Sequence, residues 1–292
     1  MRYSYRKSQV RAAYLFVTPA IIGIVIFTLI PVISALIYSF ADYNVLTSPK
    51  FIGLKNYFSL LYDKDFKKSL VNTFIYAIGT LPPKIFISLF LATLLNRKIK
   101  GISVFRACYY SPEVTSMVAV SIVWLYIYNP QLGLLNLILE KLGLQPQVWL
   151  LNPKLALPSL MLMGVWKNLG VNMMIYLAAL QDIPSTYIEA AEIDGANRWQ
   201  IFWKVTWPLL SYATFFVFIT NMIGTLQVFD QIYIMTEGGP ANATSTIVYY
   251  IYLQAFQQFH MGYASAMAFV LAAIIFLLTM ISFNSRKETS MI

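Results

Sequence analysis

The segment IPSTYIEAAEIDGANRWQIFWKVTWP, residues 183–208, is a polar insert between two long apolar stretches. Because its charged and amide side chains exclude a membrane span, we expect a folded loop made of two short helices. Thr186 and Glu189 have the spacing of a capping box at the start of the first helix. Gly195 supplies the left-handed residue that ends this helix, and Asn197 can cap the second one. The aromatic side chains of the second helix are then exposed, as on a docking surface.

The composition of the 292-residue chain is that of a membrane protein. Hydrophobic residues make up 59% of it and charged residues 11%, and its mean hydropathy is +0.64. Soluble domains usually carry about 25% charged residues. The net charge of +9 comes from basic residues that flank apolar segments, which fits membrane topology better than nucleic-acid binding. A single cysteine, Cys108, and a single histidine, His260, argue against an internal disulfide, a metal site and histidine-based catalysis.

Apolar segments along the chain predict an all-α membrane protein with six transmembrane helices in one domain. A helix needs about 20 residues to cross a bilayer, and its backbone then satisfies its own hydrogen bonds. The first segment is longer than the apolar core of a signal peptide, so we expect it to be retained. Pro82 and Pro83 are expected to break the second segment. The expected spans are residues 13–40, 69–95, 112–128, 157–180, 208–229 and 262–283.

The distribution of lysine and arginine indicates the orientation of these spans. Cytoplasmic connections of membrane proteins carry an excess of both residues. The most compact basic group connects the second and third spans and consists of Arg97, Lys98, Lys100 and Arg106. We therefore expect this connection, both termini and the loop at residues 183–207 to lie in the cytoplasm.

The loop also carries a resemblance to a known family. Glu189-Ala190-Ala191, Asp194-Gly195-Ala196 and Pro208-Leu209-Leu210 resemble the EAA loop of binding-protein-dependent ABC importer permeases. In that family this loop is the coupling helix, which sits in a cleft of the cytoplasmic ATPase. The resemblance implies a role in ATPase coupling for Glu189, Ala190, Ala191, Asp194, Gly195, Ala196, Trp199 and Phe202. An ordinary helix–turn–helix connector is the alternative.

Further fragments with the same order extend this resemblance from about residue 15 to residue 283. They include Phe51-Ile52-Gly53-Leu54-Lys55-Asn56-Tyr57, Asn129-Pro130 with Gly133-Leu134-Leu135-Asn136, Thr236-Glu237-Gly238-Gly239-Pro240, and Gly262-Tyr263-Ala264-Ser265-Ala266. The chain is most similar to maltose- and glycerol-3-phosphate-type permeases, in the subgroup usually listed first of the two permeases. One departure is that Ser211 and Tyr212 stand where such proteins often have a second proline.

The resemblance implies the setting in which the chain works. It implies a type I ABC importer fold in the cytoplasmic (inner) membrane of a bacterium or archaeon. The implied partners are a homologous second permease, two ATPase subunits, an extracytoplasmic solute-binding protein and membrane lipid. ATP and magnesium would belong to the ATPase, so this chain binds no cofactor. In agreement, the sequence has no Gly-x-x-x-x-Gly-Lys-[Ser/Thr] phosphate loop.

Polar side chains within the expected spans are candidates for solute contact. They are costly in lipid, and they usually face a cavity or another helix. Amides and hydroxyls both donate and accept hydrogen bonds, which suits sugar hydroxyls, and an indole ring can stack on a sugar. Bonds between helices explain such residues equally well. The candidates are Trp166, Asn168, Asn172, Asn221, Thr225 and Gln227.

Two lysines, Lys84 and Lys167, lie inside expected spans. Each can pair with a carboxylate such as Glu113, or with one on a partner subunit, because buried charges usually have partners. Each can also face an aqueous cavity and attract a phosphate. The second possibility leaves glycerol 3-phosphate open as a solute.

Three functions follow from these residues. The first is the permease subunit of an ATP-driven importer for a sugar or a related carbohydrate, with a glycerol-3-phosphate or polyol importer as its variant. The second is an ATP-independent secondary transporter, which often shows paired broken helices. Only Pro82-Pro83 indicates such a break. The third is an intramembrane enzyme, for which the sequence offers no nucleophile or metal-ligand set.

Overall fold

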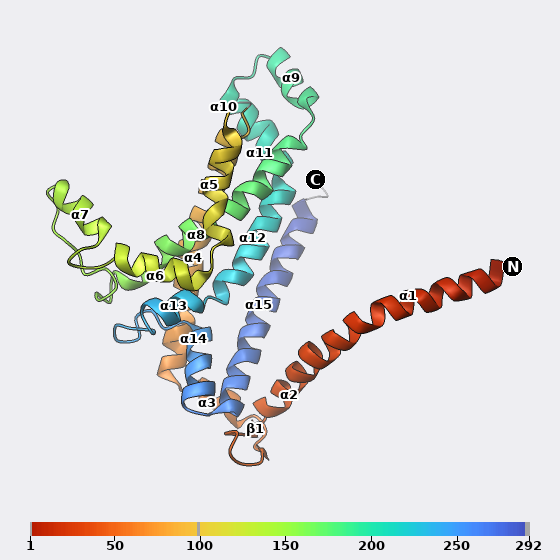
Figure 1. The fold of residues 1–292 in the computed structure, drawn as a ribbon, viewed down its shortest axis with the longest axis vertical. Helices are drawn as coiled ribbons and strands as arrows, with labels where there is room; N and C mark the ends of the chain where they lie inside the picture. Colours follow the sequence, from red (N-terminus) through yellow and green to blue (C-terminus); the bar gives the residue numbers. More distant parts are fainter. Residues whose placement is uncertain (1, 98–99, 290–292) are drawn as a thin grey trace. The chain divides into compact units, whose positions relative to one another are not determined.

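Helix α4 (Lys64–Leu95), of 32 residues, is the centre of the larger of two compact units in the computed structural model (Figure 1). The structure describes residues 2–97 and 100–289. The expectations for Lys98 and for the two chain ends therefore lie outside the described residues. One unit comprises Met1–Asp63 with Ile251–Ala273, and the other comprises Lys64–Tyr250 with Ile274–Ile292.

In the larger unit, α4 packs along α8 (Ala156–Gln181), and both contact α5 (Ile102–Val114) and α12 (Ser211–Leu226). Apolar side chains recur every three or four residues along the inner faces of these helices, as helical periodicity requires. The buried cluster that results contains Ile85, Leu89, Ala92, Leu95, Met173, Tyr176, Leu177, Leu210 and Val217. Dispersion contacts at such an interface hold the helices together within lipid.

Glycine permits a close helix contact in this unit. A methyl group at Gly170 of α8 would lie 2.5 Å from the carbonyl oxygen of Tyr109 and 2.8 Å from the Cα atom of Tyr110. Both atoms belong to the backbone of α5, so neither can move aside alone. The hydroxyl of Ser88 on α4 donates a 3.2 Å hydrogen bond to the Leu169 carbonyl nearby. Small residues thus bring α4, α5 and α8 together, as is common between membrane helices.

The expected break at Pro82-Pro83 is wrong, because both prolines lie inside the unbroken α4. Membrane helices tolerate proline where neighbouring helices surround the freed backbone groups. The breaks occur elsewhere. Helix α5 ends at Val114, and α6 (Met117–Ile127) leaves it at 100°. The expected third span, 112–128, therefore contains a sharp bend and not one straight helix.

A second bend precedes α12. The short helix α10 (Arg198–Ile201), the π-helical turn η2 (Phe202–Thr206) and α11 (Trp207–Leu209) run on from one another, and α12 follows at 64°. Helix α12 ends at Leu226, and the short α13 (Asp230–Met235) then packs against α6. The expected fifth span, 208–229, thus corresponds to a shorter helix with irregular ends.

Two side-chain amides hold the polar loops of the larger unit in place. The amide of Asn136 in α7 (Leu134–Lys141) donates to the carbonyls of Pro130 and Gln147, and its oxygen accepts from the Trp149 indole at 2.8 Å. The Asn72 amide on α4 donates 3.0 Å bonds to the carbonyls of Asn242 and Ser245. These bonds satisfy loop backbone groups that no helix or strand would satisfy.

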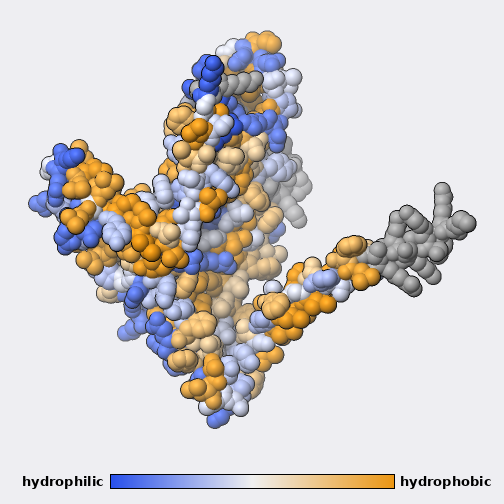
Figure 2. Space-filling model, viewed as in Figure 1, coloured by the Kyte–Doolittle hydropathy of each residue, from blue (hydrophilic) through white to orange (hydrophobic). Residues whose placement is uncertain are grey.

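The smaller unit begins with one continuous helical rod, made of α1 (Arg2–Ile24), the π-helical turn η1 (Val25–Leu29) and α2 (Ile30–Ser39). Strands β1 (Ala41–Asp42) and β2 (Lys50–Phe51) pair antiparallel, and α3 (Lys55–Leu60) follows. The Asn56 amide fixes this turn by donating 3.0 Å bonds to the carbonyls of Ser39 and Ala41. Large apolar side chains along the rod are exposed, which suits contact with lipid (Figure 2).

The remaining elements are α9 (Ser185–Ile193), α14 (Ile247–Tyr252), the π-helical turn η3 (Leu253–Gln257) and α15 (Met261–Thr289). The part of α15 within the larger unit packs on α12, where the rings of Phe215 and Phe283 lie 4.9 Å apart. Four helices in the described residues are long and apolar enough to cross a membrane, and the total is six if each bent pair is one span. The expectation of an all-α membrane protein is confirmed.

Replacing Gly170 by alanine should lower the stability of the protein, because the added methyl group overlaps the α5 backbone. We expect a loss of about 1–3 kcal/mol, measured as a lower melting temperature of the purified protein in detergent. Gly224→Ala is the matched control, since nothing lies within 4 Å of a methyl group there. Equal melting temperatures for the two variants would contradict the proposed close contact.

Candidate functional site

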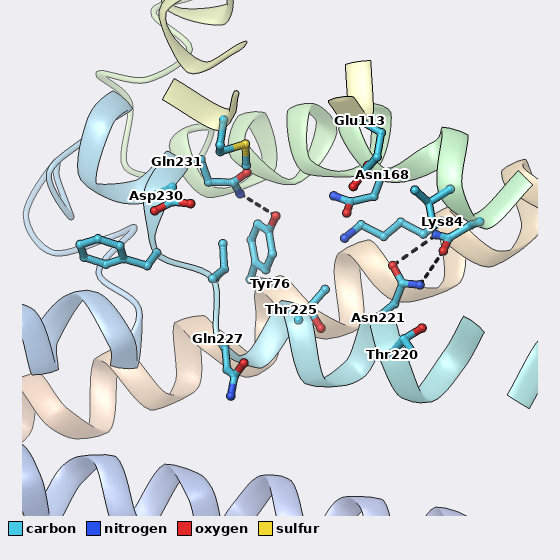
Figure 3. A pocket seen from close by; sticks show the side chains of 16 residues that line it. Tyr76, Lys84, Glu113, Asn168, Thr220, Asn221, Thr225, Gln227, Asp230 and Gln231 are labelled. Atoms are coloured by element: carbon cyan, nitrogen blue, oxygen red, sulfur yellow. Dashed lines mark hydrogen bonds between the residues drawn. The ribbon is translucent and has the colours of Figure 1, made fainter. Parts of the chain in front are cut away.

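A polar cavity of about 330 Å³ lies within the larger unit, between α4, α5, α8, α12 and the start of α13 (Figure 3). Its position follows from the fold, because α5 ends and bends away at one side while α12 ends and turns into α13 at the other. The polar side chains that line the cavity are Tyr76, Lys84, Glu113, Asn168, Asn172, Thr220, Asn221, Thr225, Gln227, Asp230 and Gln231.

Five of the six solute-contact candidates named from the sequence line this one cavity, namely Asn168, Asn172, Asn221, Thr225 and Gln227. The sixth, Trp166, does not line it. Its ring packs edge-on to Trp124 with centroids 5.5 Å apart, and 40% of the residue is exposed. Two residues of helix correspond to about 200°, so Trp166 and Asn168 point to opposite sides of α8.

Asn172 and Asn221 join α8 to α12 by a reciprocal amide pair. Asn221 Nδ2 donates to Asn172 Oδ1 at 2.8 Å, and Asn172 Nδ2 donates back to Asn221 Oδ1 at 3.2 Å. Asn221 also donates to the Val217 carbonyl at 2.8 Å. Both residues are buried, so the pair satisfies amides that lipid and apolar side chains cannot. At these two positions the structure therefore shows a helix–helix bond beside the cavity.

A second buried pair closes the end of the cavity near α13. Gln231 Nε2 donates to the Tyr76 hydroxyl at 2.6 Å, and both residues are almost fully buried. Gly164 leaves the space that the Tyr76 hydroxyl occupies, because a Cβ atom at this position would overlap it. Sequence reasoning missed both members of the pair. Tyr76 is one of 20 tyrosines, and Gln231 faces inward only because the chain turns back after Gln227.

The two lysines of the expected spans have different surroundings. Lys167 Nζ donates a 2.9 Å hydrogen bond to the backbone carbonyl of Glu113, close to the C-terminal end of α5, where the helix dipole favours a cation. Lys84 lines the cavity and is 4% exposed. No carboxylate among the described residues lies within 4.0 Å of its ammonium group, so the expected close ion pair with Glu113 is absent from the described part of the chain.

The segment with the EAA-type sequence forms a helical elbow at one end of the larger unit, the same end as the connection from α4 to α5 (Figure 1). Helix α9 ends at Ile193, and Gly195 follows with φ +80°. The Ala196 N–H bonds to the Ala191 carbonyl at 2.9 Å and the Gly195 N–H to the Glu192 carbonyl at 3.0 Å. This is the bonding of a Schellman motif, so the predicted role of Gly195 in ending the helix is confirmed.

The two helix starts differ from each other. Asn197 and Gln200 form a capping box at the start of α10, with bonds of 2.9 and 2.8 Å, so the prediction for Asn197 is confirmed. The prediction of a capping box by Thr186 and Glu189 is wrong. Helix α9 begins at Ser185 after Pro184 and has no side-chain cap. Thr186 therefore lies inside the first turn, where its hydroxyl does not face the free N–H groups.

Side chains of the elbow face outward. Of the eight residues to which the resemblance assigned coupling, five are exposed, namely Glu189, Ala190, Asp194, Gly195 and Trp199, while Ala191, Ala196 and Phe202 are half-buried. Phe202 packs against the buried cluster of α4, α8 and α12. Trp199, Trp203 and Trp207 follow one another at four-residue spacing, with centroids of neighbouring rings 5.6 and 5.8 Å apart. The elbow is thus firmly attached on one side and free on the other.

These features define a membrane protein of several spans, with a polar cavity in its helix bundle and an exposed helical elbow at one end. The profile of the family described as "Binding-protein-dependent transport system inner membrane component" matches residues 59–286. The chain belongs to this family. It is an ABC transporter permease of the inner membrane, and its part in the system is transport and not catalysis.

Several curated relatives are similar over nearly their whole length. The probable ABC transporter permease YesP of Bacillus subtilis is 40% identical, with 97% of this chain and 92% of the relative covered. The arabinooligosaccharide permease AraP of Bacillus subtilis is 34% identical, with 94% and 88% covered. The lactose permease LacF of Rhizobium radiobacter is 36% identical, with 94% of each covered.

A solved structure has the same fold. It is a chain of a bacterial ABC transporter involved in the import of the acidic polysaccharide alginate, with a TM-score of 0.86 and 22% sequence identity, and the match covers 99% of each chain. Because the identity is low, this likeness concerns the fold.

Replacing Asn221 by alanine should destabilise the protein, because the Asn172 amide then loses its partner in an apolar surrounding. We expect a loss of about 1–2 kcal/mol, measured as the melting temperature in detergent. The double variant Asn172→Leu/Asn221→Leu should recover much of this loss, since replacing both partners removes the unsatisfied group. A single variant as stable as the parent would show that the pair does not hold α8 and α12 together.

Proposed function

We propose that this chain forms one half of the translocation pathway of an ATP-driven importer for a sugar or oligosaccharide, and that the cavity between α4, α8 and α12 is its solute site. The convergence of five predicted polar residues on one cavity carries this proposal. Amides and hydroxyls can exchange hydrogen bonds with sugar hydroxyls in either direction. Relatives named for lactose and for arabinooligosaccharides support the carbohydrate class.

The proposed partners are a homologous second permease, two ATPase subunits and an extracytoplasmic solute-binding protein. Family membership supports the binding protein, and one solved relative of the same fold was crystallised with a periplasmic protein carrying an alginate pentasaccharide. The apolar surface of the α1–α2 rod is consistent with contact to lipid and to the second permease. We propose that the chain acts as a single membrane domain, with both termini and the elbow in the cytoplasm.

Coupling is proposed to work through the exposed elbow, residues 185–201. The elbow follows α8 in the chain and leads through η2 and α11 into α12. Both α8 and α12 line the cavity. When the ATPase pair closes on ATP and moves α9, the movement therefore reaches two walls of the solute site. Coupled in this way, ATP binding changes the side from which the cavity is open.

A glycerol-3-phosphate importer is the variant to be tested beside the sugar importer. The sn-glycerol-3-phosphate permease UgpA of Agrobacterium fabrum is 33% identical over 93% of both chains. Lys84 supplies a buried cation that a phosphate could contact. The uptake experiment below includes this solute for that reason. An ATP-independent transporter would give the elbow no task, although the bend between α5 and α6 is a broken helix of the kind such transporters have.

Uptake by the assembled importer in proteoliposomes should require ATP on the side of the membrane where the ATPase subunits lie. It should also require every partner protein. We expect accumulation of radiolabelled lactose or arabinotriose, and none when ATP, the ATPase or the binding protein is omitted. Flux of these sugars through vesicles that contain this chain alone would contradict the proposal. Uptake of sn-glycerol 3-phosphate in preference to both sugars would favour the variant.

Replacing Gly195 by valine should reduce uptake by more than ten-fold while the protein stays in the membrane. A valine at φ +80° is strained, by about 1–2 kcal/mol, and the elbow then changes its angle. Gly143→Val is a closely matched control, because Gly143 has φ +73°, also has open space around it, and ends α7 with the same two backbone bonds. Uptake that falls equally in both variants would argue against a coupling role for the elbow.

A further inference from the structure

We infer that Lys84 and Glu113 together bind neighbouring hydroxyl groups of a neutral sugar, and that their charge balance disfavours anionic solutes. This inference rests on the proposed function, since it assigns a solute class to the same cavity. The two residues come from different helices, α4 and α5, and meet at one end of the cavity. Figure 3 shows both side chains and Asn168 pointing toward one another there.

Lys84 is a buried cation without a hydrogen-bond partner in the described part of the chain. The residue is 4% exposed, and it faces the cavity (Figure 3). Moving an ammonium group out of water is costly unless hydrogen bonds or an opposite charge compensate it. Coulomb attraction to Glu113 gives part of this compensation, but the two groups do not form an ion pair within 4.0 Å. Its three N–H donors are therefore available to a solute.

Glu113 complements this donor with a free acceptor. Its Oε2 atom is buried and has no hydrogen-bond partner among the described residues. Lys167 donates to the backbone carbonyl of Glu113. The Glu113 side chain lines the same end of the cavity, where Asn168 adds an amide.

The chemistry of this end of the cavity selects groups that both accept and donate. A hydroxyl can accept from the Lys84 ammonium and donate to the Glu113 carboxylate, and two neighbouring hydroxyls can do so together. Bonds of this kind to charged groups are stronger than those between neutral groups. A carboxylate or phosphate on the solute can accept from Lys84, but it is repelled by Glu113 and by Asp230, which also lines the cavity. The charges therefore favour a neutral, hydroxyl-rich solute.

Solute binding at this site can be measured on the assembled transporter with a single cysteine reporter. The reporter is Gly224→Cys, which lines the cavity where a side chain meets no other atom within 4 Å, in a Cys108→Ser background that removes the only native cysteine. The readout is the concentration of solute that halves the alkylation rate by a water-soluble maleimide. The probes are lactose and arabinotriose as neutral sugars, and galacturonate and sn-glycerol 3-phosphate as anions.

We expect a neutral sugar to protect the reporter and the anions to protect it less. Lys84→Met and Glu113→Gln should each raise the half-protecting concentration of that sugar at least about ten-fold, as the loss of a hydrogen bond to a charged group predicts. Glu113→Gln should also improve protection by the anions, because it removes a repelling charge. Lys67→Met is the matched control, since Lys67 lies on the same helix α4 and is exposed. It should leave the half-protecting concentration of every probe unchanged.

The double variant Lys84→Met/Glu113→Gln distinguishes solute contact from structural pairing. If the two charges only stabilise each other, the double variant should bind the sugar like the parent; if each contacts the sugar, it should bind at least as weakly as the single variants. Unchanged protection in the single variants, recovery in the double variant, or better protection by anions than by any neutral sugar would overturn the inference. The proposed function is judged separately by ATP-driven uptake, which the importer can pass even if these variants bind normally.

Discussion

Close packing of α4 on α8 is the constraint on which the rest of the structure depends. Gly170 lets the α5 backbone approach α8, Gly164 leaves room for the Tyr76 hydroxyl, and Ser88 bonds across to the Leu169 carbonyl. Without a hydrophobic driving force between helices in lipid, such contacts and bonds are what hold a bundle. They fix the inner faces of both helices, and Asn168 and Asn172 of α8 then line the cavity beside α12.

The cavity and the exposed elbow are linked by the order of the chain. The elbow stands between α8 and α12, and the same two helices are joined by the Asn172–Asn221 amide pair at the cavity wall. The amide pair at the cavity wall and the elbow that turns at Gly195 are therefore connected through α8 and α12. This arrangement supports the proposal that movement of the exposed elbow reaches the cavity wall.

Charged side chains distinguish this cavity from a helix interface that is lined only by neutral polar groups. The Asn172 and Asn221 amides bond to each other, so part of their hydrogen-bonding capacity is already used within the protein. Lys84, in contrast, has no hydrogen-bond partner among the described residues, and neither does the buried Oε2 atom of Glu113. In a low-dielectric surrounding such groups are expensive, and a solute that pairs with them recovers that cost. The cavity contains one cation, Lys84, and two acidic residues, Glu113 and Asp230, and we infer that this balance disfavours an anionic solute.

The sequence by itself determined the membrane class, the approximate position of the spans, the glycine that ends α9 and the capping box at Asn197, because each rests on composition or on neighbours a few residues apart. It also named five of the polar residues that line the cavity. Only the tertiary structure decided that Pro82-Pro83 leaves α4 unbroken, that the chain bends instead between α5 and α6, and that Trp166 faces away. Likewise, the pairing of Gln231 with Tyr76 and the separation of Lys84 from Glu113 depend on contacts between residues distant in the chain. Local patterns fix what a segment forms, whereas packing against other helices fixes where it bends and which side chains meet.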